Sequence, residues 1–306
     1  TLATAGAARN SRNAMGDEAA ASAPSRPIRL GRFELHLLSD GTFRLDGGAM
    51  YGVVPKALWE RAAPADERNR VLLSLGCLLI RTPDGKNILV DAGLSSKYDS
   101  NRKFINTYSV ERKRTLLDEL SALGLGPADI HMVVNTHLHF DHAGGDTERD
   151  ATGRLRPQFP NARYVIQKLE WADAHRAHER NRASYLEENF APLQDSGLLE
   201  LVEGDAELDP GVKVLRSGGH TRGHQCVLLE SEGRKALFLG DLIPTRSHVP
   251  LPWIMAYDLY PLETLESKRA LLKKAQEEGW LLLFQHDPER RSGVLKEAEG
   301  RTVLVL

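Results

Sequence analysis

Three strongly apolar runs in this sequence each lead into a residue type that binds metals. The run "HMVVNT" leads into His137, "ALFLG" into Asp241, and "LLLFQ" into His286. A carboxylate or imidazole at the end of a buried strand is costly unless it is paired or bound to a cation. Because this arrangement occurs three times, packing alone explains it poorly, and the pattern favours buried strands that carry metal ligands at their ends.

Strand and helix signals alternate from Ile28 onward. Residues 76–93 predict a hairpin closed by a turn at Pro83-Asp84-Gly85, and residues 33–41 predict a strand that ends in a turn at Asp40-Gly41. Helical spacing or composition predicts three helices, over 112–126 with an end at Gly124 or Gly126, over 168–193, and over 261–278 with an end at Gly279.

The two halves of the chain have similar patterns. In each half a hairpin, a helix and a strand precede a ligand-type segment, "THLHFDH" in the first and "FQHDP" in the second. This order predicts an α/β (α+β) fold, an αββα sandwich of two mixed β-sheets with helices on the outer faces. Without a low-complexity linker, residues 27–306 are predicted to form a single domain. Residues 1–26 lack apolar periodicity and are expected to be a flexible arm or leader.

Composition excludes several classes of protein. The formal net charge is -2 in 306 residues, which argues against a general nucleic-acid binder. No run approaches the 18 or so apolar residues of a membrane span. We therefore expect a cytoplasmic protein with a small-molecule substrate. Cys77 and Cys226, the two cysteines, lie in apolar runs and are expected to be buried, so a metal would be held by histidine and carboxylate groups.

The densest cluster of possible ligands is "NTHLHFDHAGG", residues 135–145. His137 and His139 alternate in an extended segment, so both can face one side, and Asp141 and His142 follow where the chain turns. Further candidates are His220 and His224 in "GGHTRGH", together with Asp241 and His286. Neutral imidazole and carboxylate groups are suitable ligands for zinc, and also for iron, manganese or cobalt.

Five motifs in this order, "ILVDAG", "THLHFDHAGG", "GGHTRGH", "LFLGD" and "FQHDP", resemble those of the metallo-β-lactamase superfamily of hydrolases. The resemblance implies the roles of the site residues, which we carry over one at a time. His137, His139 and His220 resemble the ligands of a first metal ion, and Asp141, His142 and His286 those of a second. Asp241 resembles the carboxylate that bridges both ions. Asp91 and His224 resemble residues of the shell that supports the ligands.

The resemblance also implies a chemistry. Two divalent cations, in the first instance zinc, share a hydroxide that exists at neutral pH because zinc lowers the pKa of bound water toward ~7. Asp141 is expected to orient this nucleophile or to move its proton, and Asp241 to hold both ions. The expected reaction is cleavage of a lactone, ester or phosphotriester.

Alternatives within the superfamily remain open. A β-lactamase is disfavoured because members with that activity usually have Cys or Ser where Asp241 stands. A glyoxalase-type thioester hydrolase would usually carry a basic C-terminal helical region, and the lysines and arginine of 267–279 are more typical of a packed surface helix. From a different class, a metal-dependent binding or regulatory protein with residual hydrolysis is also possible.

Two segments are candidates for the substrate pocket because they place apolar and aromatic side chains beside glycines and prolines. Residues 44–55 offer Met50 and Tyr51, and residues 250–261 offer Trp253, Met255 and Tyr257. In lactonase-like relatives a tyrosine near the bridging aspartate contacts the substrate, and Tyr257 or His248 could take that role here. Such relatives tend to form dimers, so a homodimer is expected.

Overall fold

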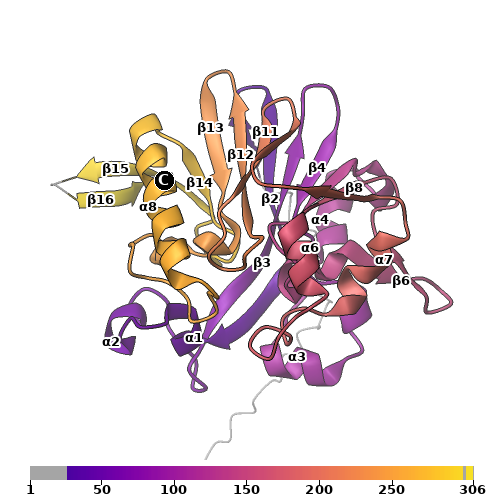
Figure 1. The fold of residues 1–306 in the computed structure, drawn as a ribbon, viewed down its shortest axis with the longest axis horizontal. Coiled ribbons are helices and arrows are strands. Elements are labelled where there is room, and N and C mark those ends of the chain that lie inside the picture. Colours follow the sequence, from indigo (N-terminus) through magenta and orange to yellow (C-terminus); the bar gives the residue numbers. More distant parts are fainter. Residues whose placement is uncertain (1–25, 299–300, 306) are drawn as a thin grey trace, which may run out of the picture.

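The computed structural model describes residues 26–298 and 301–305. Two seven-stranded mixed sheets lie face to face, with helices on their outer faces (Figure 1). The predicted αββα sandwich is therefore confirmed. The arm expected over residues 1–26 lies almost wholly outside the described residues. Within the described part of the chain, no helix is long and apolar enough to cross a membrane.

The first sheet has the strand order β1-β2-β3-β4-β5-β8-β9. Its strands are β1 (Ile28–Leu30), β2 (Phe33–Asp46), β3 (Arg70–Arg81), β4 (Asn87–Val90), β5 (Met132–Val134), β8 (Arg163–Gln167) and β9 (Leu199–Val202). The pairs β1–β2, β2–β3 and β3–β4 are antiparallel, whereas β4, β5, β8 and β9 run parallel. A small separate sheet pairs β6 (Thr147–Arg149) with β7 (Leu155–Pro157).

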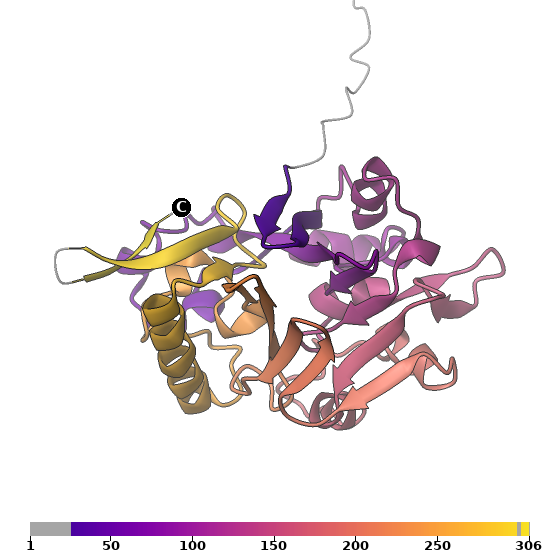
Figure 2. The same ribbon diagram turned by 90° about the horizontal axis from the view of Figure 1, so that it is seen from above.

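The second sheet has the order β10-β11-β12-β13-β14-β15-β16. Its strands are β10 (Ala206–Asp209), β11 (Val212–Arg216), β12 (Gln225–Ser231), β13 (Arg234–Phe238), β14 (Leu281–Leu283), β15 (Ser292–Ala298) and β16 (Arg301–Val305). Only β13 and β14 run parallel, because α8 connects them as a crossover. Figure 2 shows the β15–β16 hairpin beyond α8 at the outer edge of this sheet.

The α-helices of the described residues are α1 (Gly47–Tyr51), α2 (Lys56–Trp59), α3 (Arg102–Tyr108), α4 (Leu116–Ala122), α5 (Phe140–Ala143), α6 (Lys168–Ala174), α7 (Ala191–Gln194) and α8 (Pro261–Glu278). Figure 1 shows α4 and α6 on one side of the sandwich and α8 on the other. Between the sheets, fully buried residues of both inner faces form one apolar layer, which includes Leu35, Ile80, Val134, Val214, Val227 and Phe238. Burying each such side chain stabilises the fold by roughly 1.5–3 kcal/mol.

The parallel strands position the candidate site. Because β4 and β5 run parallel, the residues after their carboxyl ends, Asp91 and the His137 segment, lie at one edge of the first sheet. The residues after β13 and β14, Asp241 and His286, lie at one edge of the second sheet for the same reason. The ligand-type residues that the sequence puts at strand ends therefore meet across the sandwich.

Two local predictions from the sequence are wrong. Asp40-Gly41 is not a turn, because β2 continues through it with a register shift between Ser39 and Thr42, and the φ of 112° at Gly41 accommodates this irregularity. The helix predicted over 168–193 stops at Ala174, and turns follow as far as Leu186. Residues 175–184 contain only two apolar side chains, both alanines, so this stretch has no apolar stripe to stabilise a helix.

Other local predictions are confirmed. The 76–93 hairpin closes at Pro83-Asp84-Gly85, where Gly85 N–H donates to Thr82 O at 3.1 Å. The helix predicted over 112–126 is present as the shorter α4, which begins only at Leu116 and is followed, as expected, by Gly124 at φ 75°. Cys77 and Cys226 are buried and free.

The C-terminal end of α8 offers a test of the local backbone. Gly279 has left-handed angles, φ 66° and ψ 39°, and a Cβ built on it would meet no atom within 4 Å. Gly279→Ala is expected to lower the free energy of unfolding by about 1 kcal/mol through backbone strain alone. Urea denaturation measures this difference, with the exposed Lys274→Ala as a control that leaves stability nearly unchanged. An unchanged midpoint in Gly279→Ala would contradict the left-handed helix end.

Candidate metal centre

Five segments bring the seven ligand-type residues together. His137 and His139 follow β5, Asp141 and His142 lie on α5, and His220 follows β11. Asp241 and His286 come from the second sheet, after β13 and β14. None of the seven residues is more than 8% exposed. Seven polar side chains buried at one place require a partner for their lone pairs and charges.

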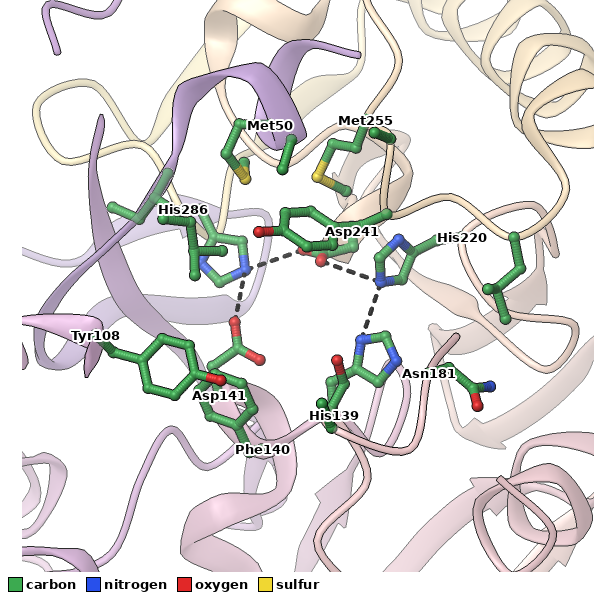
Figure 3. Close-up of a pocket in the computed structure, with 18 of the residues that line it drawn as sticks. Met50, Tyr108, His139, Phe140, Asp141, Asn181, His220, Asp241, Met255 and His286 are labelled. Atoms are coloured by element: carbon green, nitrogen blue, oxygen red, sulfur yellow. Dashed lines mark hydrogen bonds and ion pairs between the residues drawn. The ribbon is translucent and has the colours of Figure 1, made fainter. Parts of the chain in front are cut away.

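The side chains form overlapping groups whose ligand atoms lie within 4.8 Å of one another. Within the described residues these groups are His137–His139–His220, His137–His142–Asp241 and Asp141–His142–His286. Figure 3 shows Asp241 between His286 and His220, with its two carboxylate oxygens facing different histidines. Asp241 Oδ1 is 3.0 Å from His286 Nε2, and Asp241 Oδ2 is 3.3 Å from His220 Nε2.

Hydrogen bonds on the far side of two imidazoles fix which nitrogen faces the centre. His286 Nδ1 lies 2.8 Å from Ser74 O, and His142 Nδ1 lies 3.0 Å from Asp91 Oδ2. Since a carbonyl and a carboxylate only accept hydrogen bonds, both Nδ1 atoms carry a proton, and in the neutral rings both Nε2 atoms would present a lone pair to a cation. These Nε2 atoms are only 3.2 Å apart, and Asp141 Oδ2 is 3.6 Å from each. Lone pairs and a carboxylate at such distances repel unless a cation lies between them.

The same reasoning applies to the other end of the centre. His220 Nδ1 lies 2.8 Å from Asp258 Oδ1, so His220 Nε2 presents its lone pair to His139 Nδ1 at 3.1 Å. Burial lowers the pKa of His137 and His139 well below the ordinary value, so both are neutral imidazoles, the form that binds metals.

Buried atoms without a hydrogen-bond partner mark the interior of the centre. They include His137 Nε2 and Asp241 Oδ1. A tetrahedral zinc ion with bonds of 2.0–2.1 Å to nitrogen would hold its ligand atoms about 3.4 Å apart. The contacts between ligand atoms given above span 3.0 Å to 3.6 Å. The residues present therefore fit divalent cations held by imidazole and carboxylate groups.

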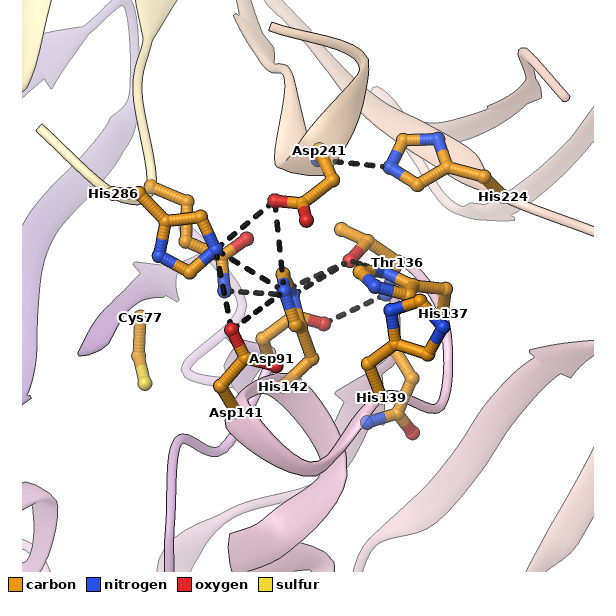
Figure 4. Close-up of polar contacts among 12 residues, drawn as sticks. Cys77, Asp91, Thr136, His137, His139, Asp141, His142, His224, Asp241 and His286 are labelled. Atoms are coloured by element: carbon orange, nitrogen blue, oxygen red, sulfur yellow. Dashed lines mark hydrogen bonds and ion pairs between the residues drawn. The ribbon is translucent and has the colours of Figure 1, made fainter. Parts of the chain in front are cut away.

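Asp91 supports the centre from below. Its carboxylate accepts from Thr136 N–H at 2.7 Å and from Thr136 O–H at 2.8 Å, in addition to its contact with His142 (Figure 4). The backbone of Asp91 has φ 56°, an uncommon conformation for a residue other than glycine. Asp91 thus holds both an imidazole and the backbone that precedes His137, which orients these ligands.

His224 acts on the backbone of Asp241 rather than on the centre itself. Its Nε2 accepts from Asp241 N–H at 3.0 Å (Figure 4). Its Nδ1 lies 2.6 Å from Ser217 Oγ. A Cβ on the preceding residue, Gly240, would lie 2.7 Å from His224 Nε2, so this approach requires glycine. Of the two possibilities for His224, direct ligation and a hydrogen-bonded supporting residue, the geometry fits the second.

Two supporting residues were not identified from the sequence. Asp258 contacts His220, and the side-chain amide of Gln285 lies 2.9 Å from His142 Nδ1. Asp258 could have been noticed as a charged residue between the apolar runs of 250–261. No pattern in the sequence pairs it with His220, because 38 residues separate them.

A cavity of about 340 Å³ opens onto the centre, and its lining includes Asp141, His220, Asp241 and His286. Its apolar walls come from β2, α1, β3, α5 and the 253–260 loop and are formed by Leu45, Met50, Leu73, Phe140, Met255 and Leu259. The 180–184 turns add Arg180, Asn181 and Ser184, and Tyr108 contributes from α3 (Figure 3).

Of the residues predicted for the pocket, Met50, Met255 and Tyr257 line this cavity. Tyr51 and Trp253 do not. The ring of Tyr51 is stacked 5.1 Å from Trp59 and 4.6 Å from His248, and Trp253 packs edge-on against Tyr51 at 5.7 Å. The rings of these two residues pack against other aromatic side chains, so they belong to the core and do not form the cavity wall.

His248 is also excluded from contact with substrate. Its Nδ1 lies 2.7 Å from Thr245 Oγ1 and its Nε2 lies 2.9 Å from Met50 O, so both ring nitrogens are used within the protein. Of the two residues suggested for the substrate-contacting tyrosine role, only Tyr257 lines the cavity.

The family model for the metallo-beta-lactamase superfamily matches residues 77–286, which contain all seven ligand-type residues. The chain belongs to this superfamily. It is a metal-dependent hydrolase of the metallo-β-lactamase fold.

Several relatives share most of the chain. An N-acyl homoserine lactonase from a Bacillus species is 29% identical over 236 residues, which cover 72% of this chain and 84% of the relative. A solved structure of a probable metal-dependent hydrolase from Staphylococcus aureus is 33% identical, covers 91% of this chain and 98% of that chain, and superposes with a TM-score of 0.84. The dizinc quorum-quenching lactonase AidC, 22% identical, covers 91% of this chain and 96% of its own with a TM-score of 0.72, and shares the fold.

The contact between Asp258 and His220 leads to a prediction about metal affinity. Asp258→Ala removes the acceptor that fixes the His220 ring and is expected to weaken metal binding by about 10–100-fold. Asp258→Asn keeps an acceptor oxygen and should lose less. Competition of the apoprotein with a chromophoric chelator for Zn²⁺ measures both variants. Equal affinity in wild type and Asp258→Ala would contradict an orienting role for Asp258.

Proposed function

We propose that this hydrolase is a dinuclear lactonase that opens neutral, acyl-bearing lactones, and that simple esters and phosphotriesters are lesser substrates of the same site. The observation that carries the proposal is the cavity, which is apolar at its walls and has the ligand cluster at its base. The N-acyl homoserine lactonase activity of several relatives supports it.

In this proposal His137, His139 and His220 hold one divalent cation, and Asp141, His142 and His286 hold the second. The two oxygens of Asp241 face the two groups and would contact both ions. When bound, the cations supply an activated water and an electrophile for the scissile carbonyl or phosphoryl oxygen. Zinc is the proposed ion because imidazole and carboxylate ligands at these spacings suit it.

Asp141 is proposed to handle the proton of the reaction. Its carboxylate lines the cavity and lies 3.6 Å from both His142 and His286. From this position it can orient the attacking water and carry a proton toward the leaving oxygen. The apolar walls exclude bulk water, which strengthens the interactions of both carboxylates with the reacting groups.

The charge of the cavity favours neutral substrates. Arg180 is the only lysine or arginine among the described residues that line it, and its guanidinium donates to Ala256 O at 2.7 Å. A glutathione thioester or a cephalosporin carries carboxylates that need cationic partners. This argues against the glyoxalase-type and β-lactamase alternatives.

A substrate panel on protein of measured metal content tests the proposal. The panel contains N-hexanoyl homoserine lactone, a simple γ-lactone, p-nitrophenyl acetate, methyl paraoxon, S-lactoylglutathione and a cephalosporin. We expect the acylated lactone to have the highest kcat/KM, and expect a chelator to abolish turnover. Turnover confined to the thioester or the cephalosporin would refute the lactonase proposal while leaving the metal centre intact.

Asp241→Asn tests the dinuclear arrangement. Replacing one carboxylate oxygen by an amide nitrogen removes a ligand, so kcat for the best substrate is expected to fall at least ~100-fold, with loss of bound metal. The exposed Asp195→Asn serves as the control and should match the wild type in rate and metal content. Near-normal activity of Asp241→Asn would contradict a mechanism that needs both ions.

A further inference from the structure

A fully buried glutamate outside the ligand set joins three segments around the first group of histidines. Glu170 lies in the first turn of α6 and is 0% exposed. Its Oε1 accepts from Leu138 N–H at 3.0 Å and from Tyr185 O–H at 2.8 Å, and its Oε2 accepts from Thr221 O–H at 2.5 Å. Three donors thus hydrogen-bond to this buried carboxylate, and none of them belongs to α6 itself. Glu170 therefore connects α6 to other parts of the chain.

Each of the three partners is adjacent to the proposed first metal group. Leu138 stands between His137 and His139 in the chain, and Thr221 directly follows His220. The ring of Tyr185 packs edge-on against the ring of His139, with centroids 4.8 Å apart. The three hydrogen-bond donors of the Glu170 carboxylate therefore lie next to the three histidines of this group, and none of the three is Asp141, His142 or His286.

The backbone around Glu170 is shaped for this contact. A Cβ on Gly223, in the "HTRGH" turn, would lie 2.3 Å from Glu170 N and 2.6 Å from Glu170 Cα. Glycine at this position lets the start of α6 reach the turn that carries His220. A second tether joins the same elements at the surface, where Arg222 Nε donates to Asp173 Oδ2 at 2.9 Å.

We infer that Glu170 is a positioning residue that sets the spacing of His137, His139 and His220 and so determines the affinity of the first metal group. The inference rests on the proposed metal centre. Fixing the Leu138 amide aligns the segment after β5 that presents two of the histidines, and fixing Thr221 aligns the third against them. A ligand cage with preset spacing binds its ion without the cost of ordering these segments.

Glu170→Gln tests the inference with little change of shape. The amide oxygen of glutamine can still accept from Leu138 and Tyr185, but its nitrogen cannot accept from Thr221. We expect one of two Zn²⁺ ions to bind about 10–100-fold more weakly in competition with a chelator, with the other unchanged. Thr221→Val removes the same hydrogen bond from the other side and should weaken the same ion. Asp173→Asn, which removes one acceptor oxygen and the charge of the surface tether, is the matched control and should bind both ions like the wild type.

Stepwise titration with Co²⁺ identifies the affected group. In Glu170→Gln, the visible absorption of Co²⁺ at the site with three histidines is expected to appear only after more Co²⁺ has been added than in the wild type. The titration is carried out at a temperature far below unfolding. If both variants bind two ions with wild-type affinity and lose only thermal stability, Glu170 is merely structural and the inference is overturned. If the wild type itself binds no metal, the proposed function fails together with this inference.

Discussion

The structure depends on one electrostatic constraint, the convergence of imidazole lone pairs and carboxylates in a buried space. Ser74, Asp91 and Asp258 each accept from the outer nitrogen of one histidine, so that the inner nitrogens of His286, His142 and His220 face the carboxylates and one another. Atoms so arranged repel one another, and the fold maintains them at 3.0–3.6 Å. Under the proposed function, a bound cation would offset this repulsion, and folding of this region would be coupled to metal binding.

The sandwich makes this convergence possible by its parallel strands. β4 and β5 end at one edge of the first sheet, and β13 and β14 end at the facing edge of the second. Each sheet therefore supplies part of the ligand set, and the apolar layer between the sheets fixes their separation. The cavity is attached to the same framework, because Leu259 N–H donates to His220 O at 3.1 Å and Asp258 contacts the His220 ring. Hydrogen bonds thus connect the cavity wall directly to the ligand-type residues.

The sequence predicts the fold class and the gathering of ligand-type residues well, because both follow from local patterns. Apolar runs with polar ends indicate buried strands, and Gly279 indicates the end of α8 whatever its surroundings. Side-chain partnerships could not be predicted, because His220–Asp258 and Leu138–Glu170 join segments more than 30 residues apart. Tyr51 was misassigned to the cavity since an aromatic residue beside glycines suits a pocket wall and a stacked core equally, and only tertiary packing distinguishes them.

The most direct test of the central claim is anomalous diffraction from a crystal grown with zinc, combined with the metal content of the same protein. The account predicts two peaks roughly 3.5–4 Å apart. One should lie within bonding distance of His137, His139 and His220, and the other within bonding distance of Asp141, His142 and His286. A single anomalous peak would contradict the account. So would a crystal grown in excess zinc in which the ligand side chains are ordered but contact only water.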